Sequence, residues 1–296
     1  MDKTVSVVMT TYSGDNRSEL RDCFTSLLDQ KHQPDEVIIV RGHNLPSKLV
    51  KVITEFELNA PFSVHDIAVN ERGRGHARNV GVEKATSEFI AIIDADDIAC
   101  QDRLSRQLEY FDANPSTDVV GGYIGEFETV PSDIISVRKV PTEFEKIKRM
   151  AHYRCPINHP TVMFRRDSVL DVGNYREMEY GEDYELWCRL LSNGKNLANI
   201  PEILVKVRAT ELVTRRQGRD IARREVQLQR AIVQSGFHGW GIALANLGIR
   251  IPIRLLPKQF LKRIYRKVLR ASFIYMFFIL YSGSILSVSS PCTLIL

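Results

Sequence analysis

The sequence predicts an α/β protein in which helices flank a mostly parallel sheet, and three observations carry this prediction. Short apolar, β-branched runs recur in the first third of the chain, which is typical of strands that are buried on both faces. Amphipathic runs with helical periodicity alternate with them, and the links between the two kinds of run are short. Ligands bind such sheets at the carboxyl ends of the strands, so polar residues that follow a strand are candidates for chemistry.

The first half of the chain predicts four strands and four helices in alternation. We expect strands at residues 5–12, 35–40, 62–69 and 88–94, and helices at 17–30, 45–56, 73–85 and 102–111. The second half keeps this rhythm less regularly. There we expect a meander over 117–130, strands at 159–164 and 202–209, a helix ending at Gly194 and a long charged helix over 214–234.

Charge is distributed unevenly along the chain. Of its 40 Lys and Arg, eight lie between Arg250 and Arg270, which leaves 32 against the 36 Asp and Glu. A mildly acidic body with local basicity argues against a nucleic-acid binder, whose basic residues usually spread over the surface. The five Cys include no C-x-x-C pair, and the N-terminus shows no signal-peptide pattern. We therefore expect a reducing, cytoplasmic setting.

Three carboxylates crowd the end of the strand expected at 88–94. Asp94, Asp96 and Asp97 repel one another when ionised, unless a cation lies among them. Mn²⁺ and Mg²⁺ prefer oxygen ligands and often take only one or two from protein, the rest coming from phosphate and water. A diphosphate substrate would complete such a site. The alternative is an acidic turn, or a cap on the helix that starts near Asp102.

Two other stretches combine charged side chains with glycine. Arg78 lies in the glycine-containing helix expected at 73–85, where an arginine suits a phosphate or a base edge. Glu182 and Asp183 follow Gly181 at the start of a helix, where crowded carboxylates raise a pKa and favour a general base. The alternatives are a solvated arginine and acids that merely favour a helix N-terminus.

Together these motifs resemble those of the family 2 glycosyltransferases, which have the GT-A fold. The resemblance covers about residues 4–216 and rests on the order of SVVMTTY, ARNVGVEKATSEFIAIIDADDI, DRLSRQ, HPTVMFRR, VGNYR, GEDYELWCRL and VKVRATELVTRR. It implies an inverting transfer of one sugar from a nucleotide diphosphate sugar to a hydroxyl, with Mn²⁺ or Mg²⁺ as cofactor. The implied acceptor is a glycan or lipid-linked oligosaccharide in the synthesis of O-antigen, capsule or exopolysaccharide.

The resemblance also implies roles for individual residues. It makes Asp183 the general base, with Glu182 as its neighbour. The residues that it places at the nucleotide sugar are Thr11, Tyr12, Arg78, Asp94 and Asp96. Those that it places at the metal are Asp94, Asp96 and Asp97. Those that it places on the acceptor or diphosphate side are His159, Arg208, Arg215 and Arg216.

Two departures from the family pattern limit what the resemblance implies. The acidic turn that usually follows the second strand and holds the base is replaced by IIVRGHN, with Arg41 and Gly42, so the nucleotide stays open. The sequence lacks the Q-x-x-R-W motif of processive synthases, which favours a single addition. Two rival interpretations remain: a nucleotidyltransferase of similar fold, and a membrane-associated scaffold that has lost donor binding.

The C-terminal end differs in composition from the rest of the chain. We expect a catalytic domain over 1–210 (donor half to 115, acceptor half from 116), a helical extension over 211–249, a basic amphipathic helix over 250–270 and an uncharged tail over 271–296. Thirteen of the eighteen residues 271–288 are apolar, which is the lower limit for a bilayer span. We expect residues 250–296 to bind the cytoplasmic face of the inner membrane, peripherally or with one span. Packing on the catalytic domain or on a partner is the alternative.

Overall fold

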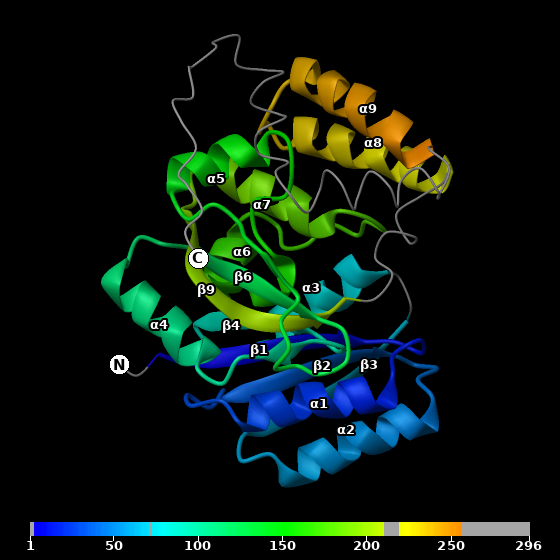
Figure 1. Cartoon of the computed structure of the whole chain (residues 1–296), viewed down its shortest axis with the longest axis vertical. Coiled ribbons are helices and arrows are strands. Elements are labelled where there is room, and N and C mark those ends of the chain that lie inside the picture. Colours follow the sequence, from blue (N-terminus) through cyan, green and yellow to red (C-terminus); the bar gives the residue numbers. More distant parts are fainter. Residues whose placement is uncertain (1–2, 71–72, 210–218, 256–296) are drawn as a thin grey trace, which may run out of the picture.

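Strands and helices alternate in this computed structural model, which describes residues 3–70, 73–209 and 219–255 (Figure 1). The strands are β1 Val5–Thr11, β2 Glu36–Gly42, β3 Ser63–Val69, β4 Phe89–Asp94, β5 Ile98–Ala99, β6 Val119–Phe127, β7 Ser136–Arg138, β8 Met163–Arg165 and β9 Leu197–Arg208. The helices are α1 Arg17–Leu28, α2 Ser47–Asn59, α3 Arg74–Lys84, α4 Arg103–Ala113, α5 Phe144–Ala151, α6 Arg166–Asp171, α7 Glu182–Ser192, α8 Arg219–Gln234 and α9 Trp240–Leu255.

In the described residues, nine strands form one sheet. Their order is β3-β2-β1-β4-β8-β6-β9-β5, and β7 pairs with β6. The first four strands run parallel to one another, whereas β8 is antiparallel to both β4 and β6. The mostly parallel α/β sheet that the sequence predicts is therefore confirmed, and every antiparallel pair in the described residues includes a strand from β6 onward.

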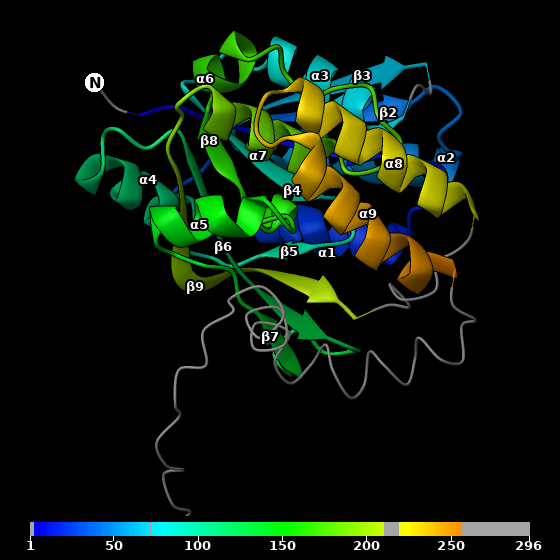
Figure 2. The same cartoon turned by 90° about the horizontal axis from the view of Figure 1, so that it is seen from above.

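Helices cover both faces of the sheet, as the alternation of side chains along a strand requires. On one face Val7 and Ile39 pack with Leu20 of α1 and Leu49 of α2. On the other face Val8 packs in a second cluster with residues of α3 and α7. Figures 1 and 2 show α1 and α2 together on the first side, and the α8–α9 hairpin lying outside α7 on the second.

The carboxyl ends of β1, β2 and β4 meet at one edge of the sheet. In the parallel register Thr10 is paired with Asp94, and Thr11 is paired with Arg41. The strand order switches at β1, since β2 and β3 lie on one side of it and β4 on the other, and such sheets bind ligands at a switch of this kind. This edge therefore positions the polar residues singled out in the sequence.

Two expectations about individual elements are wrong. The meander expected at 117–130 is one strand, β6, because it pairs with β9 along its whole length from Val119 to Phe127. His159 lies in a 3₁₀ turn, His159–Thr161, since Asn158 and Pro160 favour a turn before β8 begins. α9 runs across the boundary expected at residue 250 to Leu255, and the expected division into segments stays a prediction.

Membrane contact was expected from the C-terminal end. Within the described ranges, no helix has the length and apolar character that crossing a bilayer requires. The tail at 271–296 and most of the basic segment at 250–270 lie outside those ranges. The span considered at 271–288 therefore stays a prediction from sequence.

Candidate functional site

A tight acidic turn closes the carboxyl end of β4. The backbone N–H of Asp97 donates to the carbonyl oxygen of Asp94 over 3.1 Å. The Asp94 side chain is 34% exposed and Asp96 is exposed, whereas Asp97 is buried. The turn therefore offers two carboxylates to the outside of the sheet edge and directs the third inward.

Asp97 differs from its neighbours in environment. Burial, followed by the charges of Asp94 and Asp96, raises the pKa of Asp97 well above its usual range, although Arg138 and Arg103 act in the opposite direction. Among the residues that the structure describes, no group of three or more His, Cys, Asp or Glu is arranged to hold a metal ion. Asp97 is buried and so differs from the two more exposed carboxylates, and the metal site expected at all three stays a prediction. Asp94 and Asp96 present the oxygen donors that a hard divalent cation prefers.

Arg78 joins the acidic turn to the start of α7. Its guanidinium is buried, with Nη2 lying 3.3 Å from Oδ1 of Asp94 and Nη1 paired with Oε1 of Glu182. Burial opposes the charge of Arg78, but Asp94 and Glu182 outweigh it and raise its pKa. Both terminal nitrogens of Arg78 thus face protein carboxylates, and its expected contact with a base or phosphate stays a prediction.

Glu182 and Asp183 begin α7 after a left-handed glycine. Gly181 has φ 74°, a conformation that favours glycine, and it turns the chain abruptly into the helix. Glu182 is buried on Arg78, and burial together with Asp183 raises its pKa against the lowering effect of Arg78. Asp183 is half-buried and lies beside this pair. The helix start therefore holds one carboxylate that is engaged in an ion pair and a second that is accessible.

Thr11 ends β1 and Tyr12 follows it at the same edge of the sheet, next to Asp15, which the sequence motifs did not single out. Asp15 accepts from the hydroxyl of Thr11 over 2.8 Å and from the backbone N–H of Tyr12 over 3.0 Å. Burial raises the pKa of Asp15, and the charges of Asp96 and Asp94 add to this shift. Thr11 is buried and Tyr12 is 45% exposed, so Tyr12 is the member of this group that a ligand can reach. The four-residue spacing of Thr11 and Asp15 is the feature of the sequence that could have indicated this contact.

The end of β2 holds an ion pair at the position where the family that the sequence resembles usually has an acid. Nε of Arg41 donates to both carboxylate oxygens of Asp66 on β3, over 2.7 and 3.0 Å. Because Arg41 is paired with Thr11 in the register of β1 and β2, this ion pair flanks the end of β1. The charged groups of Arg41 and Asp66 beside Thr11 thus form an ion pair.

The residues expected on the acceptor side lie in different places. His159 is buried and its Nε2 lies 3.0 Å from the hydroxyl of Tyr175, so it is an interior residue and does not line a surface for acceptor. Arg208 pairs with Asp22 and with Glu19 of α1. Arg215 and Arg216 lie outside the described residues.

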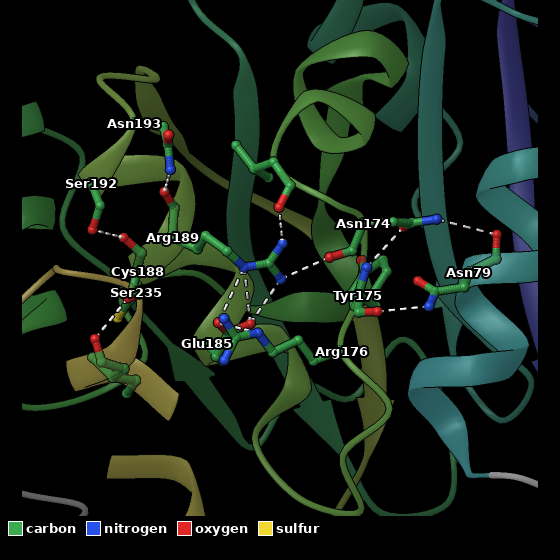
Figure 3. Close-up of polar contacts among 12 residues, drawn as sticks. Asn79, Asn174, Tyr175, Arg176, Glu185, Cys188, Arg189, Ser192, Asn193 and Ser235 are labelled. Atoms are coloured by element: carbon green, nitrogen blue, oxygen red, sulfur yellow. Dashed lines mark hydrogen bonds and ion pairs between the residues drawn. The ribbon is translucent and has the colours of Figure 1, made fainter. Parts of the chain in front are cut away.

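The loop that contains VGNYR is fixed between α3 and α7. Arg189 donates to the carbonyl oxygen of Asn174 over 2.7 Å and pairs with Glu185 over 2.8 Å (Figure 3). Asn79 of α3 donates to the carbonyl oxygen of Tyr175 over 2.6 Å, and Arg176 pairs with Glu185 over 3.1 Å. These contacts fix the position of α3 relative to α7. α3 carries Arg78, and α7 carries Glu182.

Acid should destabilise the fold through His159. Burial, followed by the charges of Arg78, Arg74 and Arg103, lowers the pKa of His159 well below its usual range. The unfolded chain therefore takes up a proton below about pH 6.5 that the folded chain refuses, and the free energy of unfolding falls by up to about 1.4 kcal/mol per pH unit.

This loss is measured from urea unfolding of wild type and His159→Gln between pH 7.5 and 5. The variant should lose less stability over this interval than wild type, whereas the exposed His43→Gln should behave as wild type. Equal losses of stability in all three proteins would contradict the role given to His159.

Comparison with known proteins supports the family resemblance. The sequence model of the glycosyl transferase family 2 matches residues 6–173. An uncharacterized glycosyltransferase of Haemophilus influenzae is 35% identical over 90% of this chain and 98% of its own length. The amylovoran biosynthesis glycosyltransferase AmsE of Erwinia amylovora is 32% identical over 88% of this chain and 98% of its own length. An Escherichia coli UDP-Gal:alpha-D-GlcNAc-diphosphoundecaprenol beta-1,3-galactosyltransferase is 32% identical over 90% and 96%.

Solved structures with low sequence identity share the fold. The mannosyltransferase PcManGT from Pyrobaculum calidifontis, in complex with GDP-Man and Mn²⁺, has a TM-score of 0.60 at 17% identity, covering 94% of this chain and 79% of that one. S. aureus TarS 1–349 in complex with UDP-GlcNAc has a TM-score of 0.61 at 17% identity, covering 85% and 72%. The GT-A fold that the sequence predicts is thereby confirmed. With relatives that align over nearly their whole length and a family match over more than half of the chain, this protein belongs to the glycosyl transferase family 2 and is a glycosyltransferase.

Proposed function

We propose that this chain transfers one sugar, with inversion, from a nucleotide diphosphate sugar to a hydroxyl of a lipid-linked oligosaccharide or related glycan. One observation carries the proposal: a single buried guanidinium, that of Arg78, contacts both Asp94 and Glu182. The carboxylates suited to the donor diphosphate and the helix start suited to a general base therefore share one site. Family membership favours sugar transfer over the nucleotidyltransferase and scaffold interpretations.

Asp183 is the proposed general base. It takes the proton of the acceptor hydroxyl while that oxygen attacks the anomeric carbon of the donor. The bond from the anomeric carbon to the diphosphate oxygen breaks at the same time, so one displacement inverts the configuration. No covalent sugar–enzyme intermediate is required. Glu182 is not the proposed base, because its carboxylate is committed to Arg78.

Asp94 and Asp96 are the proposed contacts to the donor diphosphate through a divalent metal. Their outward-facing carboxylates fit Mn²⁺ or Mg²⁺, which would offset the charge that develops on the departing diphosphate. Tyr12 follows β1 at the same edge of the sheet, is exposed, and is a proposed contact to the nucleoside. Asp15 holds the backbone N–H of Tyr12 and so fixes this end of β1.

The proposed acceptor is bound to a lipid, and the proposed pathway builds a surface polysaccharide. Support comes from two relatives: one is named for amylovoran biosynthesis, and the other for transfer to a GlcNAc-diphosphoundecaprenol. Such an acceptor would require the enzyme to work at a membrane surface, and we place it at the cytoplasmic face. The eight basic residues between Arg250 and Arg270 support this placement, because they suit an anionic leaflet.

Donor binding tests the proposed site. Calorimetric titration of the full chain with UDP, GDP, ADP and CDP, with and without Mn²⁺, should show tight binding of one nucleotide that depends on the metal. Asp96→Asn should weaken that binding about 10- to 100-fold, because it removes a charged ligand of the metal. Asp102→Asn, a nearby acid that pairs with Arg106 on the surface, should bind as wild type. Binding that is unaffected by Mn²⁺ and by Asp96→Asn would contradict the metal-bridged donor site.

A further inference from the structure

The segment just before the proposed general base is held by a helical hairpin that lies outside the sheet. α8 and α9 pack on each other, and α8 packs on α7 (Figures 1 and 2). Glu179, Tyr180 and Gly181 each contact this hairpin. Since α7 begins at Glu182, these contacts lie within a few residues of Asp183 along the chain.

A fully buried carboxylate organises the hairpin side of these contacts. Glu225 of α8 is 0% exposed, and its two oxygens pair with Arg250 and, over 3.3 Å, with Arg254 of α9. Nη2 of Arg254 also donates to the hydroxyl of Tyr180 over 2.7 Å, and its guanidinium lies over the Tyr180 ring. Glu225 therefore fixes the side chain of Arg254, and Arg254 in turn holds Tyr180.

A close backbone approach fixes the next residue. Gly181 lies so near α8 that a Cβ on it would stand 2.7 Å from a methyl carbon of Leu228, which is itself buried. Together with its left-handed φ of 74°, this leaves glycine as the residue that allows the chain to turn here. The point at which the chain enters α7 is therefore set by contact with α8.

The other end of the same loop is fixed independently. The contacts in Figure 3 hold residues 174–176 against α3 and α7 through Asn79, Glu185 and Arg189. Residues 177–181 span the distance between this anchor and the hairpin. Releasing the hairpin contact would leave the entry into α7 restrained from one side only.

From these contacts we infer that Glu225, Arg254 and Tyr180 are positioning residues that aim Asp183 at the acceptor hydroxyl. This inference rests on the proposed function of Asp183. None of the three needs to touch a substrate, because they act through the backbone of Tyr180–Gly181. A general base must lie within hydrogen-bond reach of its proton, and a misplacement of about 1 Å can cost about 100-fold in rate.

Steady-state kinetics of full-length wild type, Tyr180→Phe and Glu225→Gln test this role. Tyr180→Phe removes only the hydroxyl that Arg254 holds, so it is the smallest change available. We expect kcat to fall about tenfold in each variant. We expect the donor KM, and the donor Kd from calorimetry, to stay within twofold of wild type. A purely structural role would not produce this split between kcat and donor binding.

Two control variants separate an effect on the position of Asp183 from an effect on the stability of the fold. Arg224→Ala removes the ion pair to Glu179, which is 71% exposed, and should keep kcat within twofold of wild type because exposed pairs contribute little. Ile53→Val lowers stability in the core around α2, far from α7, and should lower the melting temperature without lowering kcat.

The outcomes separate this inference from the proposed function. If wild type transfers no sugar from any donor that it binds, the proposed function fails and the variants are not needed. If wild type is active and both variants keep kcat within twofold, the positioning role is overturned. A loss of donor affinity equal to the loss in kcat would also overturn it. Should Glu225→Gln fail to fold, Tyr180→Phe decides alone.

Discussion

Asp183→Asn is expected to lower kcat by a factor of about 10²–10⁴ while leaving donor affinity within twofold of wild type. The amide keeps the size and nearly the hydrogen-bonding shape of the carboxylate but cannot accept a proton at neutral pH. Asp183 is half-buried and accessible at the start of α7, so folding should be unaffected. Initial rates over a range of acceptor concentration, together with calorimetry of the donor nucleotide, measure the two quantities.

Glu182→Gln is the matched control for that assignment. Glu182 precedes Asp183 directly, but its carboxylate is buried on Arg78 and so is not presented to a substrate hydroxyl. We expect a smaller loss of kcat than in Asp183→Asn, accompanied by a loss of stability that Asp183→Asn does not show. If Glu182→Gln lost more activity than Asp183→Asn at unchanged stability, the roles of the two carboxylates would have to be exchanged.

The sheet and its first four helices could be predicted from sequence because their signals are local. Buried strands such as Val37–Val40 are continuous apolar runs, and a helix such as α1 shows its apolar stripe, Leu20, Phe24 and Leu27, in the sequence itself. The second half was harder to predict. There, β6 is one long strand because it pairs with β9, which lies about 80 residues later, and no local pattern reports that pairing.

Part of the site could be predicted for the same reason, and part could not. The acidic turn after β4 and the start of α7 appear as short motifs around Asp94 and Asp183. What each charged residue faces depends on contacts across the fold. Arg78 carries a charge suited to a phosphate, but a carboxylate 104 residues later neutralises it. His159 likewise has a side chain suited to binding a ligand at the surface, but the fold buries it beside Tyr175.

Replacing Arg78 should have the largest effect on stability of any change at this site. Arg78→Met leaves the carboxylate of Glu182 buried without its cation, which typically costs about 3–5 kcal/mol. Asp94 is 34% exposed, so water compensates it in part and its share of the loss is smaller. Urea unfolding of wild type and Arg78→Met measures this difference in the free energy of unfolding.

The pH dependence of that loss identifies its cause. Burial and Asp183 raise the pKa of Glu182, and Arg78 opposes them, so Arg78→Met raises this pKa further. A carboxyl group with a raised pKa binds its proton more tightly in the folded chain than in the unfolded one. Stability therefore falls as pH rises from the ordinary value of 4.5 to the raised value. Arg78→Met should thus lie closer to wild type at pH 5 than at pH 8.

A second substitution separates the charge of Glu182 from the packing of Arg78. Adding Glu182→Gln to Arg78→Met removes the uncompensated carboxylate, so the double variant should be more stable than Arg78→Met alone and should lose its extra pH dependence. It should still lack donor-dependent activity, because the link that holds Asp94 and the start of α7 together is gone. A double variant as unstable as Arg78→Met at pH 8 would show that packing of the arginine, and not its charge, joins the two halves of the site.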